Sequence, residues 1–518
     1  MNASNGRLLW VDDEIDMLRP HIIFLTSRGY EVVSATNGPD AIDLVAAQPF
    51  DLILLDENMP GLSGLETLSR LKDVAPTVPV VMVTKNEEED IMNQAIGSKI
   101  ADYLIKPVHP MQVLLALKKN IHRRDLVQEV AQTGYRQEFA QISQLLDSPL
   151  DSDGWKDLYR RLTYWELTLT EADSDMASLL QSQKEEANAS FAKFVRRHYE
   201  DWISHPDERP LMSPDLVRRR VLPRLEEGRR LFVLVLDNFR LDQWRMLSRE
   251  LADDFDIDED LYFSILPTAT QYARNAIFAG LMPLQIKTLY PDLWVDEDAE
   301  EGKNLNEDRL LERQFTRLRR KVDFTYHKIN DSAQIDRLLP QITSSDTRLH
   351  VLVINFIDIL SHARTDSRMV RELAGTEAAY RSITQSWFRH TPVKDLFARL
   401  AQLGGDIIVT TDHGSVRVTD PSKVVGDRSV NTNLRYKLGR NLSYNSREVI
   451  EVRNPKIWQL PAPNLTTAYI FATGSRFFAY PNNYNHYVQY YRDTFQHGGV
   501  SMEEMIVPLV TLTPKSGR

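Results

Sequence analysis

Short apolar runs alternate with amphipathic stretches over the first 120 residues of the chain. The runs occupy residues 8–11, 32–33, 52–55, 78–83 and 103–105. Runs of this kind with helical segments between them are typical of the buried strands of a doubly wound parallel sheet. We therefore predict an N-terminal flavodoxin-like α/β domain over residues 1–120.

Apolar positions recur with the helical spacing i, i+3, i+4, i+7 in the middle of the chain. One set runs from Trp155 to Leu169 and another from Phe191 to Trp202. The surrounding sequence is rich in Glu, Gln, Asp and Ser and contains no strand-like run. The pattern predicts a helical bundle connector over residues 121–227.

Three continuous apolar runs stand out in the rest of the chain, at residues 231–236, 350–356 and 406–410. Continuous apolar character is typical of central parallel strands that are buried on both faces. A second α/β domain is therefore predicted over residues 228–518. A length of 518 residues agrees with three domains of about 150 residues each.

The composition narrows the possible chemistry. The chain has no cysteine, which excludes disulfides, thiolate zinc sites, iron–sulfur clusters and cysteine nucleophiles. Any transition metal must then be bound by His, Asp, Glu or hydroxyl groups. The net charge is −11, which argues against binding of duplex DNA through bulk electrostatics, and we find no helix-turn-helix pattern. With no signal-like N-terminus and no run of about 18 apolar residues, we expect a cytoplasmic protein without a membrane span.

Acidic side chains follow two of the N-terminal strands. Asp12 and Asp13 come directly after the first apolar run, and Asp56 follows the third. The carboxyl ends of parallel strands meet at one edge of a sheet, where carboxylates repel each other unless a hard cation such as Mg²⁺ lies between them. Thr84 and Lys106 follow the fourth and fifth runs. Each acidic residue alone is equally compatible with a helix cap, but their joint placement favours a cation site.

This pattern resembles a response-regulator receiver domain. The resemblance implies that Asp56 accepts a phosphoryl group from a cognate sensor histidine kinase, and that Asp12, Asp13, Asp56 and the carbonyl of Asn58 bind Mg²⁺. It further implies that Thr84 and Lys106 bind phosphoryl oxygens and that Tyr103 changes rotamer with Thr84. We expect phosphorylation to promote a homodimer through the face formed by the helices of the fourth and fifth strands.

Each C-terminal apolar run also ends near an acidic residue, and histidines accompany them. The six residues are Asp237, Asp358, His362, Asp412, His413 and His497. Asp358 and His362 stand at i and i+4, so a helix would place both on one face. Three Asp charges against two divalent cations leave about +1, which suits a phosphate anion. An isolated Asp–His pair is more often a structural hydrogen bond, so the argument depends on all six residues together.

The segment SILPTATQYARNAIFAG provides a candidate nucleophile. Thr270 stands just before a helical stretch, where it is either a simple N-cap or a hydroxyl placed beside a phosphate at the helix N-terminus. A metal at the hydroxyl would lower its pKa. Arg274, four residues later, is a candidate phosphate contact or a structural salt bridge. The basic segment NLRYKLGRN is a weaker substrate-binding candidate or a solvated loop, through Arg435, Lys437 and Arg440.

Together these residues resemble the alkaline phosphatase superfamily, in particular its PglZ branch, over residues 228–515. The resemblance implies an alkaline-phosphatase-like fold with Thr270 as nucleophile and two Zn²⁺ ions. One ion would be bound by Asp237, Asp412 and His413 with Thr270, and the other by Asp358, His362 and His497. The ending HGGVSMEEMIVPL is a signature of this branch. The oxygen and nitrogen ligands of these two sites favour zinc first and manganese second.

A receiver, a helical bundle and a PglZ domain in this order resemble the PorX response regulators associated with type IX secretion. The resemblance implies a zinc phosphodiesterase that acts on nucleotide or oligonucleotide phosphodiesters and is controlled by phosphorylation. A sigma factor or a secretion-system component is a further expected partner. The alternative is a non-catalytic module, in which the metals brace a ligand site or a scaffold.

Overall fold

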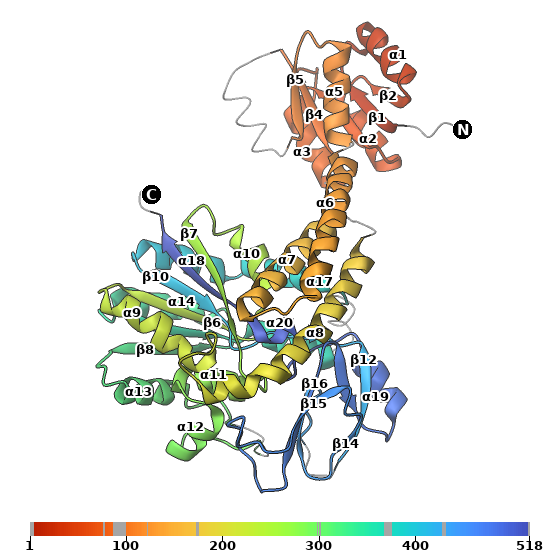
Figure 1. The fold of residues 1–518 in the computed structure, drawn as a ribbon. Helices are drawn as coiled ribbons and strands as arrows, with labels where there is room; N and C mark the ends of the chain where they lie inside the picture. The colour runs from red at the N-terminus through yellow and green to blue at the C-terminus, as the bar shows by residue number, and fades with distance from the viewer. Residues whose placement is uncertain are drawn as a thin grey trace. The chain divides into compact units, whose positions relative to one another are not determined.

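The computed structural model describes residues 5–75, 78–85, 100–121, 123–171, 176–297, 299, 302–366, 375–426 and 431–515. The chain divides into two compact units (Figure 1). The first comprises Met1–Gly134 with Ala172–Ser174, and the second Tyr135–Glu171 with Asp175–Arg518. The boundary falls inside one long helix, α6 (Arg123–Leu146), and most of the expected connector belongs to the same unit as the C-terminal domain.

The first unit contains the predicted flavodoxin-like sheet. Its described strands follow the order β2-β1-β3-β4-β5, and every pair is parallel. The strands are β1 (Gly6–Val11), β2 (Tyr30–Ala35), β3 (Leu52–Asp56), β4 (Val80–Thr84) and β5 (Asp102–Ile105). The helical segments are η1 (Ile15–Leu18), α1 (Arg19–Ser27), α2 (Gly38–Ala47), α3 (Gly64–Val74) and α5 (Pro110–Ile121). The prediction from the apolar runs is confirmed.

Alternating residues of the central strands pack into two separate cores. Leu8 and Trp10 of β1 face one cluster, whereas Leu9 and Val11 face the other. This explains the continuous apolar runs, because a strand covered by helices on both sides has no polar face. The segment between β4 and β5, on which part of the expected dimer face falls, lies outside the described residues.

The middle of the chain is helical, as predicted. After α6 come α7 (Ser152–Glu171) and α8 (Ala177–Ser204). The apolar stripes pack together: the rings of Trp155 and Phe191 lie 5.2 Å apart, and the Tyr135 hydroxyl donates to Gln183 at 3.1 Å. No helix in the described part of the chain is both long enough and apolar enough to cross a membrane.

A six-stranded sheet forms the centre of the described part of the second unit, in the order β7-β19-β10-β6-β9-β8 (Figure 1). The four strands from β10 to β8 are parallel, whereas β19 runs antiparallel to both of its neighbours. The strands are β6 (Leu231–Leu236), β7 (Phe255–Phe263), β8 (Phe324–Ile329), β9 (Leu349–Ile354), β10 (Asp406–Thr410) and β19 (Ile506–Pro514). The three predicted strands are therefore neighbours, with β6 between β9 and β10.

Helical segments connect these strands. They are η2 (Ser213–Asp215), η3 (Val217–Val221), α9 (Leu222–Glu226), α10 (Leu241–Ser248), α11 (Thr270–Ala279), α12 (Pro283–Leu289), α13 (Glu307–Arg317), α14 (Gln334–Ser344), α15 (Phe356–Asp366), α17 (Glu377–His390), α18 (Pro392–Gln402) and α20 (Met502–Met505). The apolar run 350–356 is shorter as a strand than predicted, because β9 ends at Ile354 and α15 begins at Phe356.

Short strands fill the chain between β10 and β19, a region for which the sequence pattern predicted no structure. They are β11 (Val416–Arg417), β12 (Asp420–Val425), β13 (Tyr436–Gly439), β14 (Ser443–Tyr444), β15 (Val449–Val452), β16 (Ala468–Ala472), β17 (Arg476–Ala479) and β18 (Phe495–Gln496), with the helix α19 (Tyr484–Tyr491). Because β11 pairs with β18, the region of short strands begins and ends at adjacent points.

Buried ion pairs join α7 and α8 to the rest of this unit. Glu166 of α7 lies 2.6 Å from Lys184 of α8 and 2.7 Å from Arg381 of α17. Burial opposes the charged form of Glu166, but these two cations lower its pKa to about 2. Lys184 also lies 3.3 Å from Glu503, whose carboxylate accepts a hydrogen bond from Asn188 at 3.0 Å. The two helices are thus fixed to the segment that precedes β19.

Candidate functional site

The receiver residues converge at the carboxyl edge of the first sheet. Asp12 follows β1 and Asp56 ends β3, and both side chains are buried. The Lys106 ammonium lies 2.9 Å from an Asp12 oxygen and 3.0 Å from an Asp56 oxygen. Asp13 is exposed, and it offers a carboxylate oxygen within 4.8 Å of those of Asp12 and Asp56. Three carboxylates around one space form a suitable site for a hard cation.

The electrostatics agree with this geometry. Burial raises the pKa of Asp56, and the nearby Asp12 adds to this effect while Lys106 opposes it. Burial alone would lower the pKa of Lys106, but its hydrogen bonds to Asp12 and Asp56 raise it overall. The lysine is therefore held charged between the two carboxylates, where it can meet a phosphoryl group on Asp56.

The other receiver residues surround this pocket at the ends of strands or beside them. Thr84 ends β4, and its hydroxyl donates a hydrogen bond to Glu57, a residue that the sequence analysis did not single out. Asn58 is exposed next to this pair. Tyr103 of β5 is 39% exposed, and its change of rotamer with Thr84 stays a prediction.

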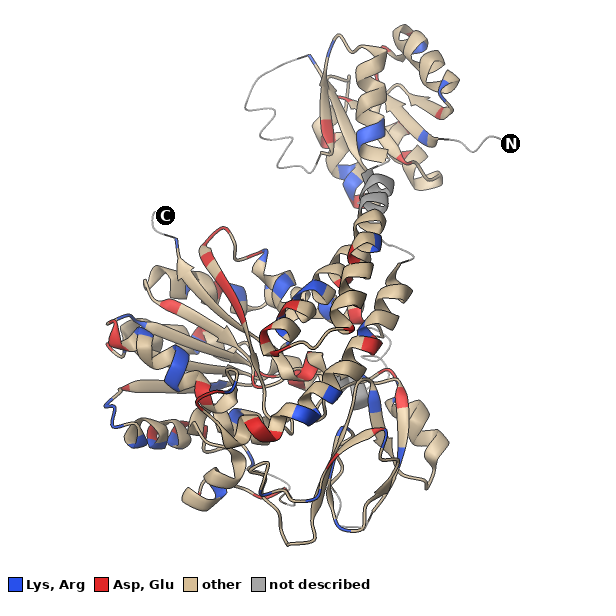
Figure 2. Ribbon diagram, viewed as in Figure 1, with Lys and Arg blue, Asp and Glu red and all other residues tan. Residues whose placement is uncertain are grey.

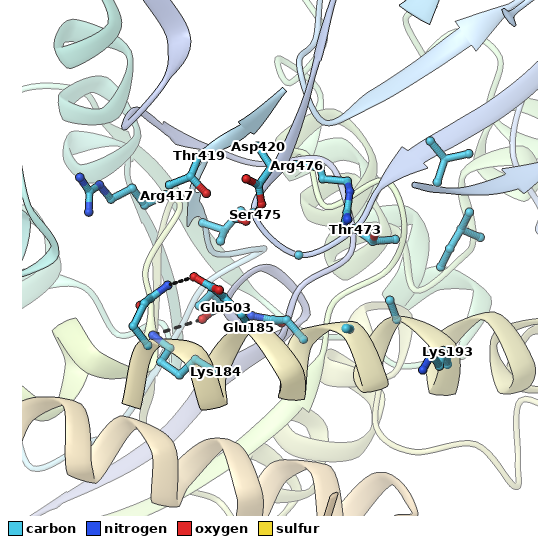
Figure 3. A pocket seen from close by; sticks show the side chains of 18 of the residues that line it. Lys184, Glu185, Lys193, Arg417, Thr419, Asp420, Thr473, Ser475, Arg476 and Glu503 are labelled. Carbon is cyan, nitrogen blue, oxygen red and sulfur yellow. Dashed lines mark hydrogen bonds and ion pairs between the residues drawn. The ribbon is translucent and has the colours of Figure 1, made fainter. Parts of the chain in front are cut away.

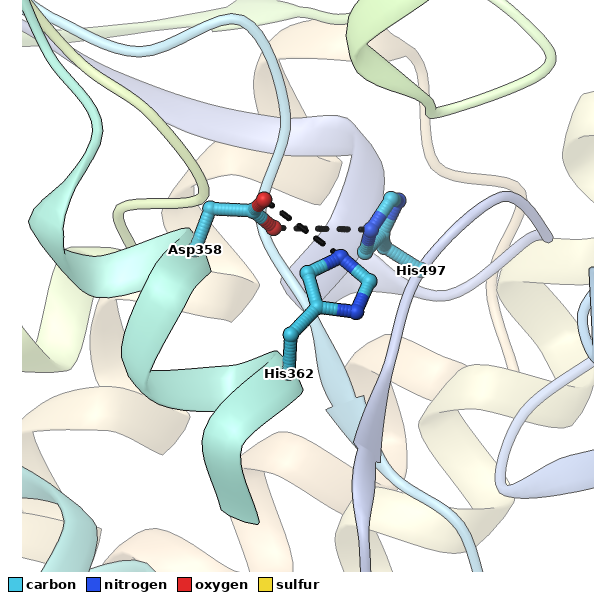
Figure 4. A group of neighbouring side chains, drawn as sticks. All are labelled: Asp358, His362 and His497. Atoms are coloured by element: carbon cyan, nitrogen blue, oxygen red, sulfur yellow. Dashed lines mark ion pairs between the residues drawn. The ribbon is translucent and has the colours of Figure 1, made fainter. Parts of the chain in front are cut away.

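The six predicted residues form two groups of candidate metal ligands in the second unit, called the metal-binding groups below. In the first group, His362 lies 3.4 Å and His497 3.6 Å from the two carboxylate oxygens of Asp358 (Figure 4). Asp358 and His362 stand one turn apart on α15, and His497 follows β18, so this group joins distant segments of the chain. One ligand atom of each residue lies within 4.8 Å of the others.

The second group consists of buried side chains at the ends of β6 and β10. The His413 Nε2 atom lies 3.8 Å from an oxygen of Asp237 and 3.8 Å from an oxygen of Asp412. One ligand atom of each of these three side chains lies within 4.8 Å of the other two. Since β6 and β10 are neighbouring parallel strands, their carboxyl ends bring Asp237 and Asp412 together.

The two groups touch each other. The rings of His413 and His497 stack with centroids 4.2 Å apart. Asn238 donates to Asp358 at 3.3 Å, and its backbone N–H donates to Asp412 at 3.4 Å. Its positive φ of 62° is a conformation that asparagine tolerates better than most residues. The groups are therefore close enough to act on one substrate.

Thr270 lies at the second group. The helix α11 begins at Thr270 and is preceded by Ala269 in the N-cap position, so Thr270 is not the N-cap that the sequence suggested. Its hydroxyl lies 3.1 Å from His413 Nε2 and 3.4 Å from an oxygen of Asp237. The hydroxyl therefore faces the candidate ligands instead of capping the helix.

The donor set fits divalent cations. Burial raises the pKa of Asp237 to about 8, and the nearby Asp412 and Asp358 contribute to the rise. One oxygen of Asp412 is buried and has no hydrogen-bond partner among the described residues. Burial lowers the pKa of His497 to about 3 and also lowers that of His413, which keeps both rings in the neutral form that binds metals. A divalent cation between these side chains would offset the repulsion among the carboxylates and be bound by the neutral imidazoles.

Arg274 is a buried structural cation. It is 2% exposed and lies 2.7 Å from Asp237, 2.5 Å from Glu307 and 3.1 Å from the Asn355 side-chain oxygen. Of the two alternatives for this residue, the structure matches the salt bridge. Arg274 thereby holds Asp237 through Oδ2, whereas His413 approaches Oδ1. Its partner Glu307 could not be predicted from the sequence.

The basic segment at 433–441 is not the solvated loop that the sequence favoured. Arg435 is buried and lies 2.6 Å from Glu504, and Lys437 is buried in β13 with its ammonium donating to the Asn431 carbonyl at 2.7 Å. Burial lowers the pKa of Lys437 to about 7. Arg440 is exposed and lines a cavity of 300 Å³ with aromatic residues of other segments. None of the three belongs to the two metal-binding groups.

Three family models match consecutive parts of the chain. Residues 8–118 match the response regulator receiver domain, residues 125–203 the PorX response regulator linker domain, and residues 216–512 the BREX system PglZ alkaline phosphatase-like domain. This order is a PorX-type architecture, as the sequence motifs suggested. The receiver implies phosphorylation by a histidine kinase, and receiver and alkaline phosphatase-like domains in general bind metals.

Individual curated relatives match about a quarter of the chain. The alginate biosynthesis transcriptional regulatory protein AlgB of Pseudomonas aeruginosa is 38% identical over 125 residues, which are 24% of this chain and 28% of AlgB. ResD of Bacillus subtilis, a transcriptional regulatory protein, is 33% identical over 26% of this chain and 52% of its own length. The chain thus spans about a quarter to a half of these relatives.

Solved structures also match about a quarter of the chain. The chemotaxis protein CheY4 of Vibrio cholerae is 27% identical, with a TM-score of 0.22, over 23% of this chain and 99% of its own. The match to the PglZ model covers more than half of the chain. The chain therefore belongs to the PglZ alkaline phosphatase-like family, as a response regulator whose receiver and PorX-type linker precede a PglZ output domain.

Proposed function

We propose that the output domain is a metal-dependent phosphodiesterase with Thr270 as its nucleophile. The observation that supports this most directly is the position of the Thr270 hydroxyl, 3.1 Å from His413 and 3.4 Å from Asp237. Two divalent cations, zinc by ligand type, would lower the pKa of this hydroxyl and stabilise negative charge on the phosphate. Asp237, Asp412 and His413 would hold one cation, and Asp358, His362 and His497 the other.

The side chains of this chain account for the remaining steps. The deprotonated Thr270 oxygen attacks phosphorus, and one alcohol of the diester leaves with a proton, which gives a diester of Thr270 with the retained alcohol. Water then cleaves the bond between phosphorus and the Thr270 oxygen, which releases a phosphomonoester and restores the hydroxyl. Arg274 keeps the Asp237 carboxylate oriented, and Asn238 fixes Asp358 relative to Asp412. The expected substrates are nucleotide or oligonucleotide phosphodiesters, which family resemblance favours over monoesters.

Metal analysis combined with a substrate panel tests this proposal. We expect the purified protein to bind about two equivalents of zinc and to hydrolyse bis(p-nitrophenyl) phosphate better than p-nitrophenyl phosphate. Chelation should lower turnover at least about a hundredfold, and added zinc should restore it. Binding of diesters without turnover would instead indicate a non-catalytic ligand-binding module.

The double variant Asp358→Ala/His362→Ala should lose about one equivalent of zinc. A matched control exists at the C-terminal end of α8, where Asp201 and the C-cap residue His205 form an exposed i, i+4 pair 3.4 Å apart. Asp201→Ala/His205→Ala should leave the zinc content unchanged. Equal zinc contents in the two double variants would contradict the ligand assignment.

We further propose that phosphorylation of Asp56 with Mg²⁺ bound by the receiver promotes a homodimer and regulates the output domain. Acetyl phosphate should double the mass of the wild-type protein in sedimentation velocity, and Asp56→Asn should abolish this response because it removes the acceptor oxygen. Asp43→Asn, on the exposed side of α2, should respond like the wild type. A wild-type mass that is the same with and without acetyl phosphate would count against the regulation.

The PorX-type architecture also supports a role in type IX secretion, with a sigma factor or a secretion-system component as partner. This role is compatible with catalysis, and the two can be separated. A catalytically inactive variant that still captures such a partner would show that the contact does not depend on turnover.

A further inference from the structure

A second cavity in the C-terminal unit lies away from the metal-binding groups. It has a volume of 420 Å³, which is within the range of small-molecule sites. One wall is the helix α8, and the opposite wall comes from the short-strand region, with Arg417, Thr419 and Arg476 (Figure 3). None of the residues that line it belongs to the two metal-binding groups.

The cavity is lined by unpaired positive charge. Basic residues recur along α8 (Figure 2), and two of them, Lys193 and Arg196, line the cavity together with Arg447 and Arg476 across from them. Among the described residues, Lys193, Arg447 and Arg476 have no carboxylate within ion-pair distance. Because the chain has a net charge of −11, a local concentration of unpaired cations is unusual and indicates a site for an anionic ligand.

The acidic residues in the wall do not cancel this charge. Glu503 is already bound by Lys184 (Figure 3) and accepts a hydrogen bond from Asn188. Glu377 lies 2.5 Å from Arg240. Asp420 accepts a hydrogen bond from Ser475 at 2.8 Å and Glu185 one from Gln181 at 2.9 Å. Four basic side chains therefore face two carboxylates that lack a cationic partner.

We propose that this cavity binds a phosphate-bearing small molecule. Several cations converge on one space, which suits a group with multiple charged oxygens, and arginine and lysine side chains are the usual partners of phosphate. The Thr419 hydroxyl lines the same space and can donate a further hydrogen bond. The cavity is too small for a folded partner but large enough for a nucleotide or a short polyphosphate.

The position of the cavity gives such a ligand a connection to the output domain. A bound ligand would contact both α8, which belongs to the PorX-type linker, and β17 of the PglZ domain. The floor of the cavity includes Asn188, which also accepts a hydrogen bond from the backbone N–H of Met502 at 2.8 Å. Met502 begins α20, five residues after His497 in the chain. Binding of a ligand in this cavity does not require that the output domain has the proposed hydrolase activity.

Isothermal titration of the full chain with tripolyphosphate tests the site. The triple variant Lys193→Gln/Arg447→Gln/Arg476→Gln should bind at least about tenfold more weakly than the wild type or lose one binding site, because it removes three converging charges. Two of these side chains are exposed and the third is half-buried, so the fold should tolerate the changes, which thermal unfolding can verify.

The matched control is Arg313→Gln/Arg337→Gln/Arg399→Gln, which makes the same charge change at exposed positions that do not line the cavity. It should retain wild-type affinity within about twofold. A parallel titration with ATP shows which part of a ligand is recognised. Similar affinities for tripolyphosphate and ATP would mean that the phosphate chain alone is recognised. Tighter binding of ATP would mean that the nucleoside is recognised as well. Equal binding of tripolyphosphate by the two triple variants, or none by the wild type, would overturn the proposal.

Discussion

Replacing Thr270 with valine is expected to lower the turnover of bis(p-nitrophenyl) phosphate by at least about a thousandfold. Valine has nearly the same shape as threonine, but it lacks the hydroxyl that lies 3.1 Å from His413. Without that oxygen no covalent intermediate can form, and only direct attack by water remains. Steady-state rates at saturating substrate and zinc measure the effect.

Thr270→Ser provides the control for this experiment. Serine keeps the oxygen at the first position of α11, so we expect a rate within about tenfold of the wild type. Zinc content measured on the same samples separates loss of the nucleophile from loss of metal. Full activity in Thr270→Val would remove Thr270 from its proposed role.

The second large effect is expected at Arg274. Arg274→Met should lower the free energy of unfolding of the metal-free protein by about 3–5 kcal/mol, because it leaves the buried carboxylates of Asp237 and Glu307 without their shared cation. Urea unfolding of chelator-treated protein, followed by tryptophan fluorescence, measures this change.

An exposed ion pair supplies the comparison for Arg274. Arg309 lies 3.1 Å from Asp292, and both side chains are at least half exposed. Arg309→Met should therefore change stability by no more than about 1 kcal/mol. If Arg274→Met kept wild-type stability and lost only activity, Arg274 would be a substrate contact, the alternative that the sequence left open.

Much of the fold could be predicted from the sequence, because buried parallel strands have a distinctive pattern. The runs that became β1, β3, β6 and β10 are continuous and apolar, and each is followed by a polar residue at the sheet edge. Five of the six candidate metal ligands could be named for the same reason, because they follow β6, β9 or β10, and the adjacency of these strands brings the five together. His497 follows β18 instead, so its position depends on a more distant part of the chain.

The rest depends on pairings between distant residues, which a single sequence does not reveal. Glu307 lies on α13 and balances Arg274 of α11, although nothing in the local sequence of either helix indicates the other. Asn238 directly follows Asp237, so its place beside the site had a visible signal, but its contact with Asp358 did not. The short strands after β10 have weak patterns of two to six residues, which turns and loops also show.

The position of β19 has a consequence for the order in which the parts of the protein assemble during synthesis. Residues 506–514 are inserted between β7 and β10, so the edge strand β7 joins the sheet only through a segment that follows all other strands in the sequence. A chain emerging from the ribosome cannot bring His497 to Asp358 or complete this sheet until residues 497–514 have been translated. The receiver, whose family match ends at residue 118, is therefore translated in full before the candidate metal-ligand groups can assemble.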